Sequence, residues 1–489
     1  MDTRRSLWAG LLVGALLGLA PSYLLLRQFA PELLARAKAL TWTAVLASLP
    51  RQPLDQLATR RAEIERRLAT LREGLHALTR DLQENTLTYA RLSVLLNQGK
   101  ARYQAGLREG NHPLFFAGVT HGNLEALRVW LEQRYASRNA VAARLETLWQ
   151  QQEQHHNAVR ELAAWQARAA ETPSAAGATL SSERVATLLL ELENLPVDLQ
   201  STPAASSPGQ SVRGLLASHA ATPEGSGVDI EEFASFLRRP EPVGYLDWQG
   251  YWVYALGEAE PPPIHPLPPL PERRALALRA AMAGLWDTLG AARFNAETPL
   301  QAVIDATPAI RGKLAALAEE IQIVDEWHGD DGSIHLLTRL PLLGRTGLLA
   351  ALTPLELRRL AQRDSSGRWP SSKLEQPGYT GLVVDTQGIQ AKPGLFPRLV
   401  TRSGRVVYDL TVSDPNALVQ RGLCIYGRSL AGLKTDPHLG DHPLIVKAAE
   451  AVGVERVDLV LEDWLGEVVM AATTGPDFLT AARVGILLD

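Results

Sequence analysis

The densest group of side chains that could do chemistry lies in the segment 436–442, where Asp436, His438, Asp441 and His442 occur within seven residues. Carboxylates and imidazoles are ligands that divalent metals take from proteins, and this spacing would allow a loop site. The same segment and the residue after it contain two prolines and a glycine, which favour a turn. We therefore expect a structural turn here, with a metal-dependent enzyme that uses this cluster as an alternative.

The other reactive side chains are more isolated. His112 and His121 flank a loop, but nothing nearby supplies further metal ligands. Cys424 is the only cysteine, which excludes internal disulfides and cysteine-based metal sites, and its apolar neighbours predict a buried side chain. The sequence contains no phosphate-binding glycine loop, nucleophile elbow or metalloprotease helix. We predict no catalytic residue, no metal and no cofactor, and hence a protein that is not an enzyme.

A long helical hairpin precedes these residues, over 51–170. Its first half carries apolar residues at alternating spacings of four and three, the pattern of a heptad seam, and Asn85 could fix the register within it. A second helical pattern begins near Asn123, runs to about Ala170 and is similar in length. The connection is rich in glycine, which predicts an antiparallel coiled-coil hairpin. The first seam consists of Ile64, Leu68, Leu71, Leu75, Leu78 and Leu82.

The connection between these helices is apolar where loops are usually polar. Leu114, Phe115 and Phe116 follow one another at what would be the tip of the hairpin. Exposed apolar patches mark contacts with a partner or a membrane, whereas two phenylalanines can also fold inward and close the end of the hairpin. Both interpretations stay open, and these three residues are the candidate partner contact.

The rest of the chain alternates between linkers and globular segments. An aromatic stretch, Tyr245–Tyr254, has the alternation of a two-stranded hairpin. Two helical patterns, 272–289 and 299–320, precede two strand patterns around a turn near residue 331, which predicts an α+β layer. We expect a membrane anchor and juxtamembrane segment (1–50), the coiled-coil hairpin (51–170), a flexible linker with a short helix (171–240), an aromatic hairpin and proline-rich spacer (241–272), an α+β domain (273–352), a linker (353–378) and a C-terminal α+β domain (379–489).

One carboxylate of the last domain has an expected structural role. Asp385 ends an apolar strand and precedes Thr-Gln-Gly, so its side chain can accept hydrogen bonds from amides of the turn. Arg398 and Arg405 are plausible ionic partners for it.

The carboxy-terminal half resembles a bacterial envelope family, that of the Helicobacter-type surface lipoproteins and the FlgP- and FlgT-like flagellar-assembly proteins. The resemblance rests on 274–289, Thr298–Ile304, Ile310–Lys313 and Asp331–Ser333, and then on the strand Tyr379–Asp385 with Gly404–Tyr408 and Asp436–Leu444. It implies periplasmic proteins that assemble into or stabilise envelope machinery, without catalytic residues. A long coiled coil and an amino-terminal apolar segment distinguish this chain from that family.

Residues 6–26 contain no charged residue and are flanked by arginines. Twenty-one residues form a helix of about 30 Å, enough to cross the hydrocarbon core of a bilayer. The run is too long and too bulky at its end for a cleaved signal peptide, so we expect an uncleaved single-pass anchor. Charges on both sides leave its orientation open.

Together these patterns predict an α plus α+β protein: an N-terminal transmembrane helix, a long antiparallel coiled-coil hairpin and two small α+β domains. The net charge of −4 gives no electrostatic reason to expect nucleic-acid binding. We expect a non-catalytic scaffold held in the inner membrane by residues 6–26, with most of the chain in the periplasm, that binds envelope proteins or itself. The alternatives are a cytoplasm-facing tether that binds a partner through the hairpin, and the metal-dependent enzyme.

Overall fold

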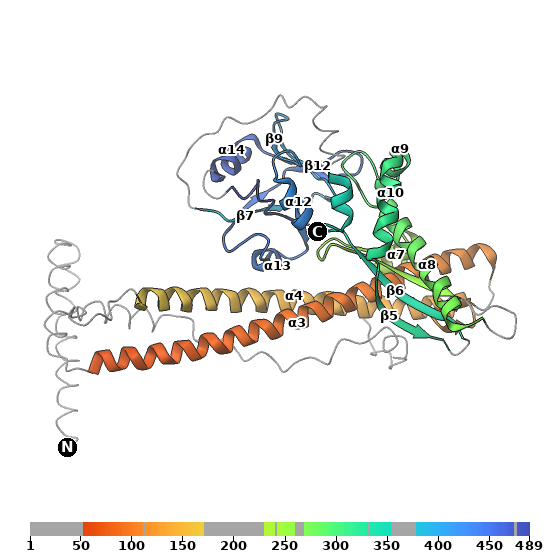
Figure 1. Ribbon diagram of the computed structural model, residues 1–489, viewed down its shortest axis with the longest axis horizontal. Coiled ribbons are helices and arrows are strands. Elements are labelled where there is room, and N and C mark those ends of the chain that lie inside the picture. Colours follow the sequence, from red (N-terminus) through yellow and green to blue (C-terminus); the bar gives the residue numbers. More distant parts are fainter. Residues whose placement is uncertain are drawn as a thin grey trace, which may run out of the picture. The chain divides into compact units, whose positions relative to one another are not determined.

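The computed structural model describes residues 52–110, 114–170, 229–239, 242–259, 268–329, 332–353, 378–473 and 477–489 (Figure 1). They form a mixture of α and α+β structure in which two long helices accompany three four-stranded sheets. None of the helices in these ranges is both long and apolar enough to cross a membrane. The predicted anchor 6–26 and the linker helix within 171–228 lie outside the described residues.

Two long helices form the helical hairpin, α3 (Gln52–Glu109) and α4 (Leu124–Ala170). Two compact units divide the chain, and the boundaries cross α3 after His76 and α4 after Glu153. Within the second unit, contacts that move forward along α3 move backward along α4, which confirms the antiparallel arrangement there. These contacts join Leu78 and Leu82 to Leu145 and Leu148, Gly99 to Leu131 and Gly106 to Leu124. In the first unit, Gly74 lies against His155.

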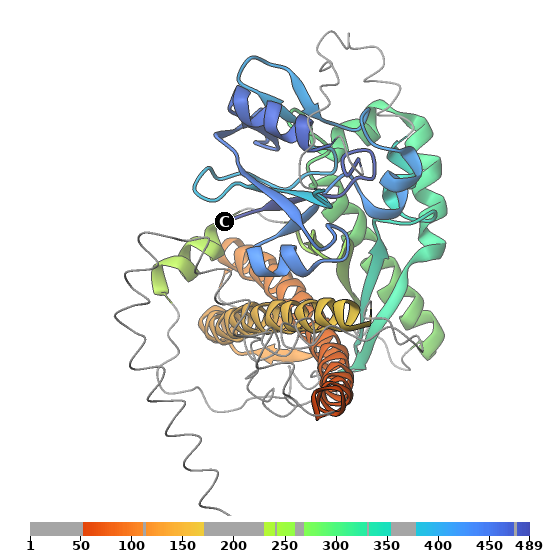
Figure 2. The same cartoon turned by 90° about the vertical axis from the view of Figure 1, so that its left-hand side faces the viewer.

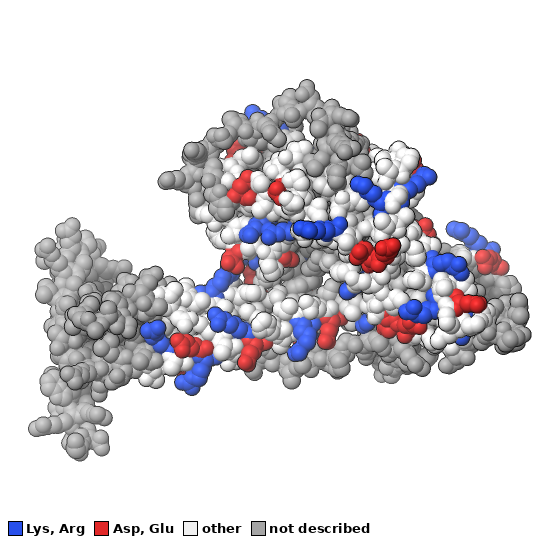
Figure 3. Space-filling model, in the orientation of Figure 1, with Lys and Arg blue, Asp and Glu red and all other residues white. Residues whose placement is uncertain are grey.

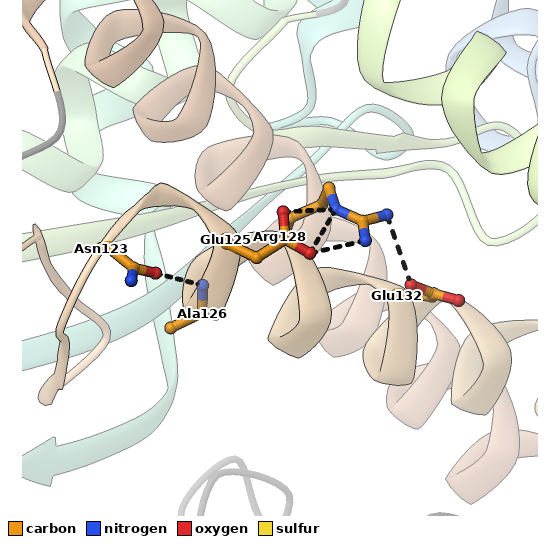
Figure 4. A network of polar contacts seen from close by, with 5 residues as sticks. All are labelled: Asn123, Glu125, Ala126, Arg128 and Glu132. Atoms are coloured by element: carbon orange, nitrogen blue, oxygen red, sulfur yellow. Dashed lines mark hydrogen bonds and ion pairs between the residues drawn. The ribbon is translucent and has the colours of Figure 1, made fainter.

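Helix α4 begins where the sequence predicts. The side-chain oxygen of Asn123 accepts a hydrogen bond from the backbone N–H of Ala126 at 2.8 Å, which satisfies one of the free donors of the first turn. Figure 4 shows this contact beside Arg128, which bonds Glu125 at 2.7 Å and lies 3.7 Å from Glu132. These side chains are three and four residues apart and therefore share one face of the helix.

The tip of the helical hairpin is a small β-hairpin rather than an irregular loop. Strand β1 (Leu114–Phe116) pairs antiparallel with β2 (Val119–His121). The two residues between them, Ala117 and Gly118, have φ values of 52° and 84°. Positive φ at both positions is characteristic of the turns that best match the twist of a two-stranded ribbon.

The next region is a four-stranded antiparallel sheet with the order β3-β4-β6-β5. Its aromatic first hairpin and its later hairpin, which the sequence assigns to segments 241–272 and 273–352, share this sheet because β4 pairs with β6. A short helix, α7, precedes it. The elements are α7 (Ile230–Arg238), β3 (Tyr245–Asp247), β4 (Trp252–Ala259), α8 (Leu270–Gly290), α9 (Leu300–Ala306), α10 (Pro308–Leu317), the 3₁₀ turn η1 (Ala318–Glu320), β5 (Gln322–His328) and β6 (Ile334–Pro341).

Helix α8 covers one face of this sheet at very close range. An added Cβ on Gly257 of β4 would lie 1.9 Å from the carbonyl oxygen of Ala277 and 2.5 Å from the backbone nitrogen of Ala281. Only glycine lets the helix and the strand approach so closely. The opposite face of the same sheet packs against α3, so the sheet lies between two helical layers.

The helix predicted over 299–320 is two helices. Pro308 lacks the N–H that a continuous helix needs, and the preceding Thr307 has φ −130° and ψ 89°, outside the helical region. The prediction of one continuous helix was wrong at this point.

The region 378–489 contains two further sheets with the orders β10-β14-β7-β11 and β12-β13-β8-β9. All pairings in the first are parallel. Its β7 confirms the strand predicted before Asp385. The elements are β7 (Gly381–Asp385), β8 (Leu399–Thr401), β9 (Val406–Tyr408), α12 (Pro415–Arg421), β10 (Ile425–Gly427), α13 (Leu430–Thr435), β11 (Pro443–Lys447), β12 (Glu450–Val452), β13 (Asp458–Leu461), α14 (Asp463–Ala472) and β14 (Val484–Leu487).

The two globular regions share one hydrophobic core. Phe294 and Phe396 meet edge to face with 5.1 Å between ring centroids, and the backbone N–H of Phe396 donates to the carbonyl of Phe294 at 3.0 Å. Arg293 also forms an ion pair with Glu455 at 3.1 Å. The α+β regions are therefore packed together rather than joined only by a linker.

Helix α4 also contacts the C-terminal region. The Ser429 hydroxyl donates to Glu146 at 3.0 Å, and Lys434 lies 3.4 Å from Glu153. The Trp149 ring lies close enough to α13 that a Cβ on Gly432 would come within 3.2 Å of it. The contact is thus mostly polar, with one aromatic ring added to it.

Candidate functional site

A group of polar side chains that includes a buried glutamate and a buried histidine lies on the sheet face that packs against α3. Glu258 of β4 and Trp327 of β5 both stand opposite His335 of β6 in the strand register. Residues that are opposite one another on neighbouring strands project from the same face. The sheet therefore places a carboxylate, an imidazole and an indole side by side.

Ser333 completes this cluster. Its hydroxyl lies 2.8 Å from Nε2 of His335, while Nδ1 of His335 lies 3.7 Å from Oε1 of Glu258. The guanidinium of Arg102, on α3, is 3.8 Å from the other oxygen of Glu258. The His335 ring stacks on Trp327 with 5.1 Å between centroids and an interplanar angle of 10°. These five residues are the sheet-face cluster.

The order serine, histidine, carboxylate is the one that activates a serine nucleophile in hydrolases. Here, however, the side chains of Ser333 and His335 are completely buried, and the histidine–carboxylate distance is too long for a hydrogen bond. No substrate can reach the hydroxyl in this arrangement. The geometry instead suits a polar anchor between the sheet and the helical hairpin.

Further contacts from α3 support that role. Asn97 donates from Nδ2 to the carbonyl of Gly244 at 2.7 Å, and Gln98 donates from Nε2 to that of Leu256 at 3.2 Å. Arg91 forms a half-buried ion pair with Asp325 at 3.6 Å. Burial lowers the pKa of Arg91, and the charge of Asp325 opposes this shift. Side-chain amides that bond backbone carbonyls of β4 and of the residue before β3 fix the helix along the sheet.

The tip of the hairpin reaches the same cluster. The position of a Cβ on Gly118, in the turn between β1 and β2, lies 3.5 Å from Nε2 of His335 and 3.9 Å from Nε1 of Trp327. The turn therefore lies directly on the sheet-face cluster, and residues separated by more than 200 positions in the sequence come together.

The three predicted contact residues at the tip have different environments. Phe116 is completely buried, and its ring meets Trp130 edge to face at 5.5 Å. Leu114 is half-buried and packs against the same apolar cluster. Burial of Phe116 is the feature that the second interpretation expects. Partner contact by Leu114, Phe115 and Phe116 stays a prediction, and the side chain of Phe115 lies outside the described residues.

The cluster predicted over 436–442 is used for local structure. The Asp436 carboxylate accepts the backbone N–H of His438 at 2.8 Å, and Nε2 of His438 donates to the carbonyl of Ala482 at 2.5 Å. The His442 ring stacks on Tyr379 at 5.1 Å. Within the described residues no group of three or more histidine, cysteine or acidic side chains is placed to hold a metal ion.

Burial sets the protonation of this turn. It lowers the pKa of His438 to about 4, because the imidazolium form would lose its hydration. The Ala482 carbonyl can accept only from the Nε2–H form, which fixes the tautomer. Burial raises the pKa of Asp436, and the bond from the His438 amide opposes that shift. His438 is therefore neutral at pH 7 and serves as a structural donor.

Two other predictions concern single side chains. Asp385 accepts the N–H of Gln387 at 2.9 Å, as expected for a turn carboxylate. Arg398 does not pair with it but with the buried carboxylate of Asp458, at 2.5 Å. Cys424 is buried, and burial raises the pKa of its thiol to about 12, so the thiolate is absent at neutral pH.

Charged side chains on the surface are mixed in sign. On the face in Figure 3, Lys and Arg lie among Asp and Glu over the described residues and do not gather into a broad basic patch. This distribution of surface charge does not test nucleic-acid binding, and its absence stays a prediction.

Sequence reasoning did not find the sheet-face cluster. The sequence patterns predict Ser333 and His335 only as residues of a turn and a strand, and they give Glu258 no role. Alternation along β4 and β6 places these residues on one face, but only the pairing of strands far apart in the sequence brings Glu258 to His335.

The C-terminal region matches a known family. Residues 381–489 match the family described as Treponema pallidum Tp0624, second domain, so the C-terminal region is similar to a domain of a bacterial protein. This segment begins at β7 and contains all the strands of the last two sheets. No curated protein matches the chain.

Proposed function

We propose that this protein is a non-catalytic structural or assembly scaffold of the bacterial cell envelope, anchored in the inner membrane by residues 6–26 and with most of the chain in the periplasm. The observation that carries this proposal is that the ionisable side chains of both candidate sites form structural contacts. The buried Ser333, His335 and Glu258 of the sheet-face cluster, and the part-buried Asp436 and His438 of the turn, are engaged in contacts that hold elements together.

The arrangement of the helical hairpin also supports a scaffold. Its distal half contacts the antiparallel sheet through α3 and the C-terminal region through α4. A hairpin held at two places can transmit force or present a fixed surface, whereas a free arm loses conformational entropy on each binding event. We further propose that the carboxy-terminal half is related to the envelope lipoproteins it resembles, with an apolar helix in place of their lipid.

The side of the membrane decides between this proposal and a cytoplasm-facing tether. Val454 is 83 % exposed in the C-terminal region, whereas Cys424 is buried and supplies no reactive thiol. A Val454→Cys variant should therefore react with a membrane-impermeant maleimide, with the wild-type protein as the unlabelled control.

We expect labelling in cells whose outer membrane has been permeabilised and whose inner membrane is intact. Labelling only after lysis of the inner membrane would instead place this region in the cytoplasm and refute the proposal. The same variant without residues 6–26 should be released from membranes that are washed with carbonate. If this shortened protein stays with the membranes, the proposal that residues 6–26 are the anchor is refuted, independently of the labelling result.

A further inference from the structure

Helix α7, drawn yellow-green in Figure 2, is a short amphipathic helix that packs against residues of α3 and α4, and we call the surface that these residues form the groove. Phe233 and Phe236, three residues apart, are 2 % and 6 % exposed, whereas Ile230 of the same helix is 72 % exposed. A helix this short is not stable alone in water. Its helical state therefore depends on the surface that receives these two rings.

The groove contacts both aromatic anchors. The Tyr135 ring of α4 lies 5.4 Å from the ring of Phe233 and 5.2 Å from that of Phe236. Nζ of Lys100, on α3, lies 4.4 Å from the Phe236 centroid, and the guanidinium of Arg138 lies 5.5 Å from it. Cations over ring faces add to the apolar burial of the rings.

Polar contacts at both ends determine the direction of α7. The Tyr135 hydroxyl donates to Glu232, in the first turn, at 2.7 Å. At the other end, Nε2 of Gln104 donates to the carbonyl of Leu237 at 2.7 Å, a group that a helix cannot satisfy internally. The acidic first turn thus faces a hydroxyl donor, and basic residues of the groove lie over the rings.

We propose that this groove, formed by Lys100, Gln104, Tyr135 and Arg138, is a helix-binding site that α7 occupies as an exchangeable ligand. Its partner is an amphipathic helix with an acidic first turn and two aromatic residues three positions apart. The resident helix defines that chemistry, and it binds in the mode by which short amphipathic helices enter grooves. This inference goes beyond the scaffold proposal and does not depend on the side of the membrane.

Covalent attachment gives α7 an advantage over any free helix, because a tethered ligand acts at a high effective concentration, in the millimolar range for short linkers. A free peptide should therefore enter only when the tethered anchors are removed. The test uses the full chain with Phe233→Ala and Phe236→Ala together, and a fluorescent peptide of residues 229–239. The matched control is Ile230→Ala, which changes an exposed residue of the same helix.

We expect the peptide to bind the double variant at least about tenfold more tightly than the wild type or Ile230→Ala, because only the vacated groove can bury the two phenylalanine rings of the peptide. A peptide with alanine at both anchors should not bind. Equal binding to all variants, or none to a double variant with wild-type circular dichroism, would overturn the proposal.

Hydrogen exchange of the wild type gives a second measurement in case the double variant does not fold. An exchangeable α7 opens without the helical hairpin, so its amides should exchange at least about tenfold faster than those of α3 near Lys100. Exchange of both helices at one common rate would show that α7 is a permanent part of the core and would refute the inference.

Discussion

Replacing Phe116 by alanine tests whether the tip of the helical hairpin is an internal joint. The side chain is completely buried, meets Trp130 edge to face and lies against Gly99 of α3. Truncation of a buried phenylalanine costs about 3–5 kcal/mol, from lost transfer energy and from the cavity left behind. We expect the upper part of this range, because α3 is held by the antiparallel sheet and α4 by the C-terminal region, so that the two helices can close the cavity only partly.

The assay is urea unfolding of the full chain followed by tryptophan fluorescence, together with hydrogen exchange of residues 114–135. The matched control is Val129→Ala, the neighbour of Trp130 on α4, which is 42 % exposed and should cost less than about 1 kcal/mol. Faster exchange in β1 and β2 is expected only in Phe116→Ala. A loss of unfolding free energy below about 1 kcal/mol in Phe116→Ala, with unchanged hydrogen exchange in β1 and β2, would refute the idea that the tip is an internal joint. Weaker partner binding at unchanged stability would instead identify Phe116 as a partner contact.

Two further predictions concern backbone packing and pH. Gly257→Ala should destabilise the protein by at least about 1–3 kcal/mol in urea unfolding, because the new Cβ would meet the α8 backbone at 1.9 Å. Gly312→Ala in α10, where no atom lies within 4 Å, should instead stabilise by up to about 1 kcal/mol, and equal effects would contradict this reasoning. His438 has a pKa of about 4 in the folded protein against 6.5 for an unperturbed histidine, so the unfolded chain binds more protons between these pH values and stability falls as pH falls from about 6.5 to 4. The full loss of unfolding free energy over this range is about 3 kcal/mol. The variant His438→Gln keeps a neutral donor for the Ala482 carbonyl, so its unfolding free energy should vary less with pH over this range. Parallel pH profiles of the wild type and the variant would refute the assignment.

The helical elements follow from local signals in the sequence. The start of α4 is marked by the capping residue Asn123, and the heptad seam of α3 repeats over many turns, so both extents are predictable. Asn85 is less simple, since its amide donates to the carbonyl of Asp81 in its own helix at 2.7 Å. A polar side chain in a heptad seam can bond a carbonyl of its own helix or a group of the facing helix. Heptad spacing does not distinguish these two hydrogen-bond partners.

The contacts of the tip could not be predicted in the same way. An apolar tripeptide at the end of a coiled coil gives no information on what covers it. Phe116 meets Trp130 of α4, whereas the adjoining turn residue Gly118 lies on Trp327 of β5 and His335 of β6, more than 200 residues later. Helix α7 was missed for a related reason. Its nine residues follow a long stretch rich in small and polar residues, and its two phenylalanines acquire meaning only when Tyr135 is known to lie opposite them.

The same geometry explains how the end of a coiled coil can carry an apolar tip. A coiled coil whose end were free would expose Phe116, whereas here the two-residue turn at Ala117–Gly118 returns the chain so that Phe116 is buried between the helices and Gly118 lies on His335. Glu258 and Arg102 then bring opposite charges to within 3.8 Å at the edge of that contact. Apolar burial supplies most of the stabilisation and the polar groups fix the register, since a shift by one strand residue would turn Glu258 and His335 towards the apolar face of α8. A joint built in this way resists sliding of the hairpin along the sheet, which is the mechanical property that a scaffold requires.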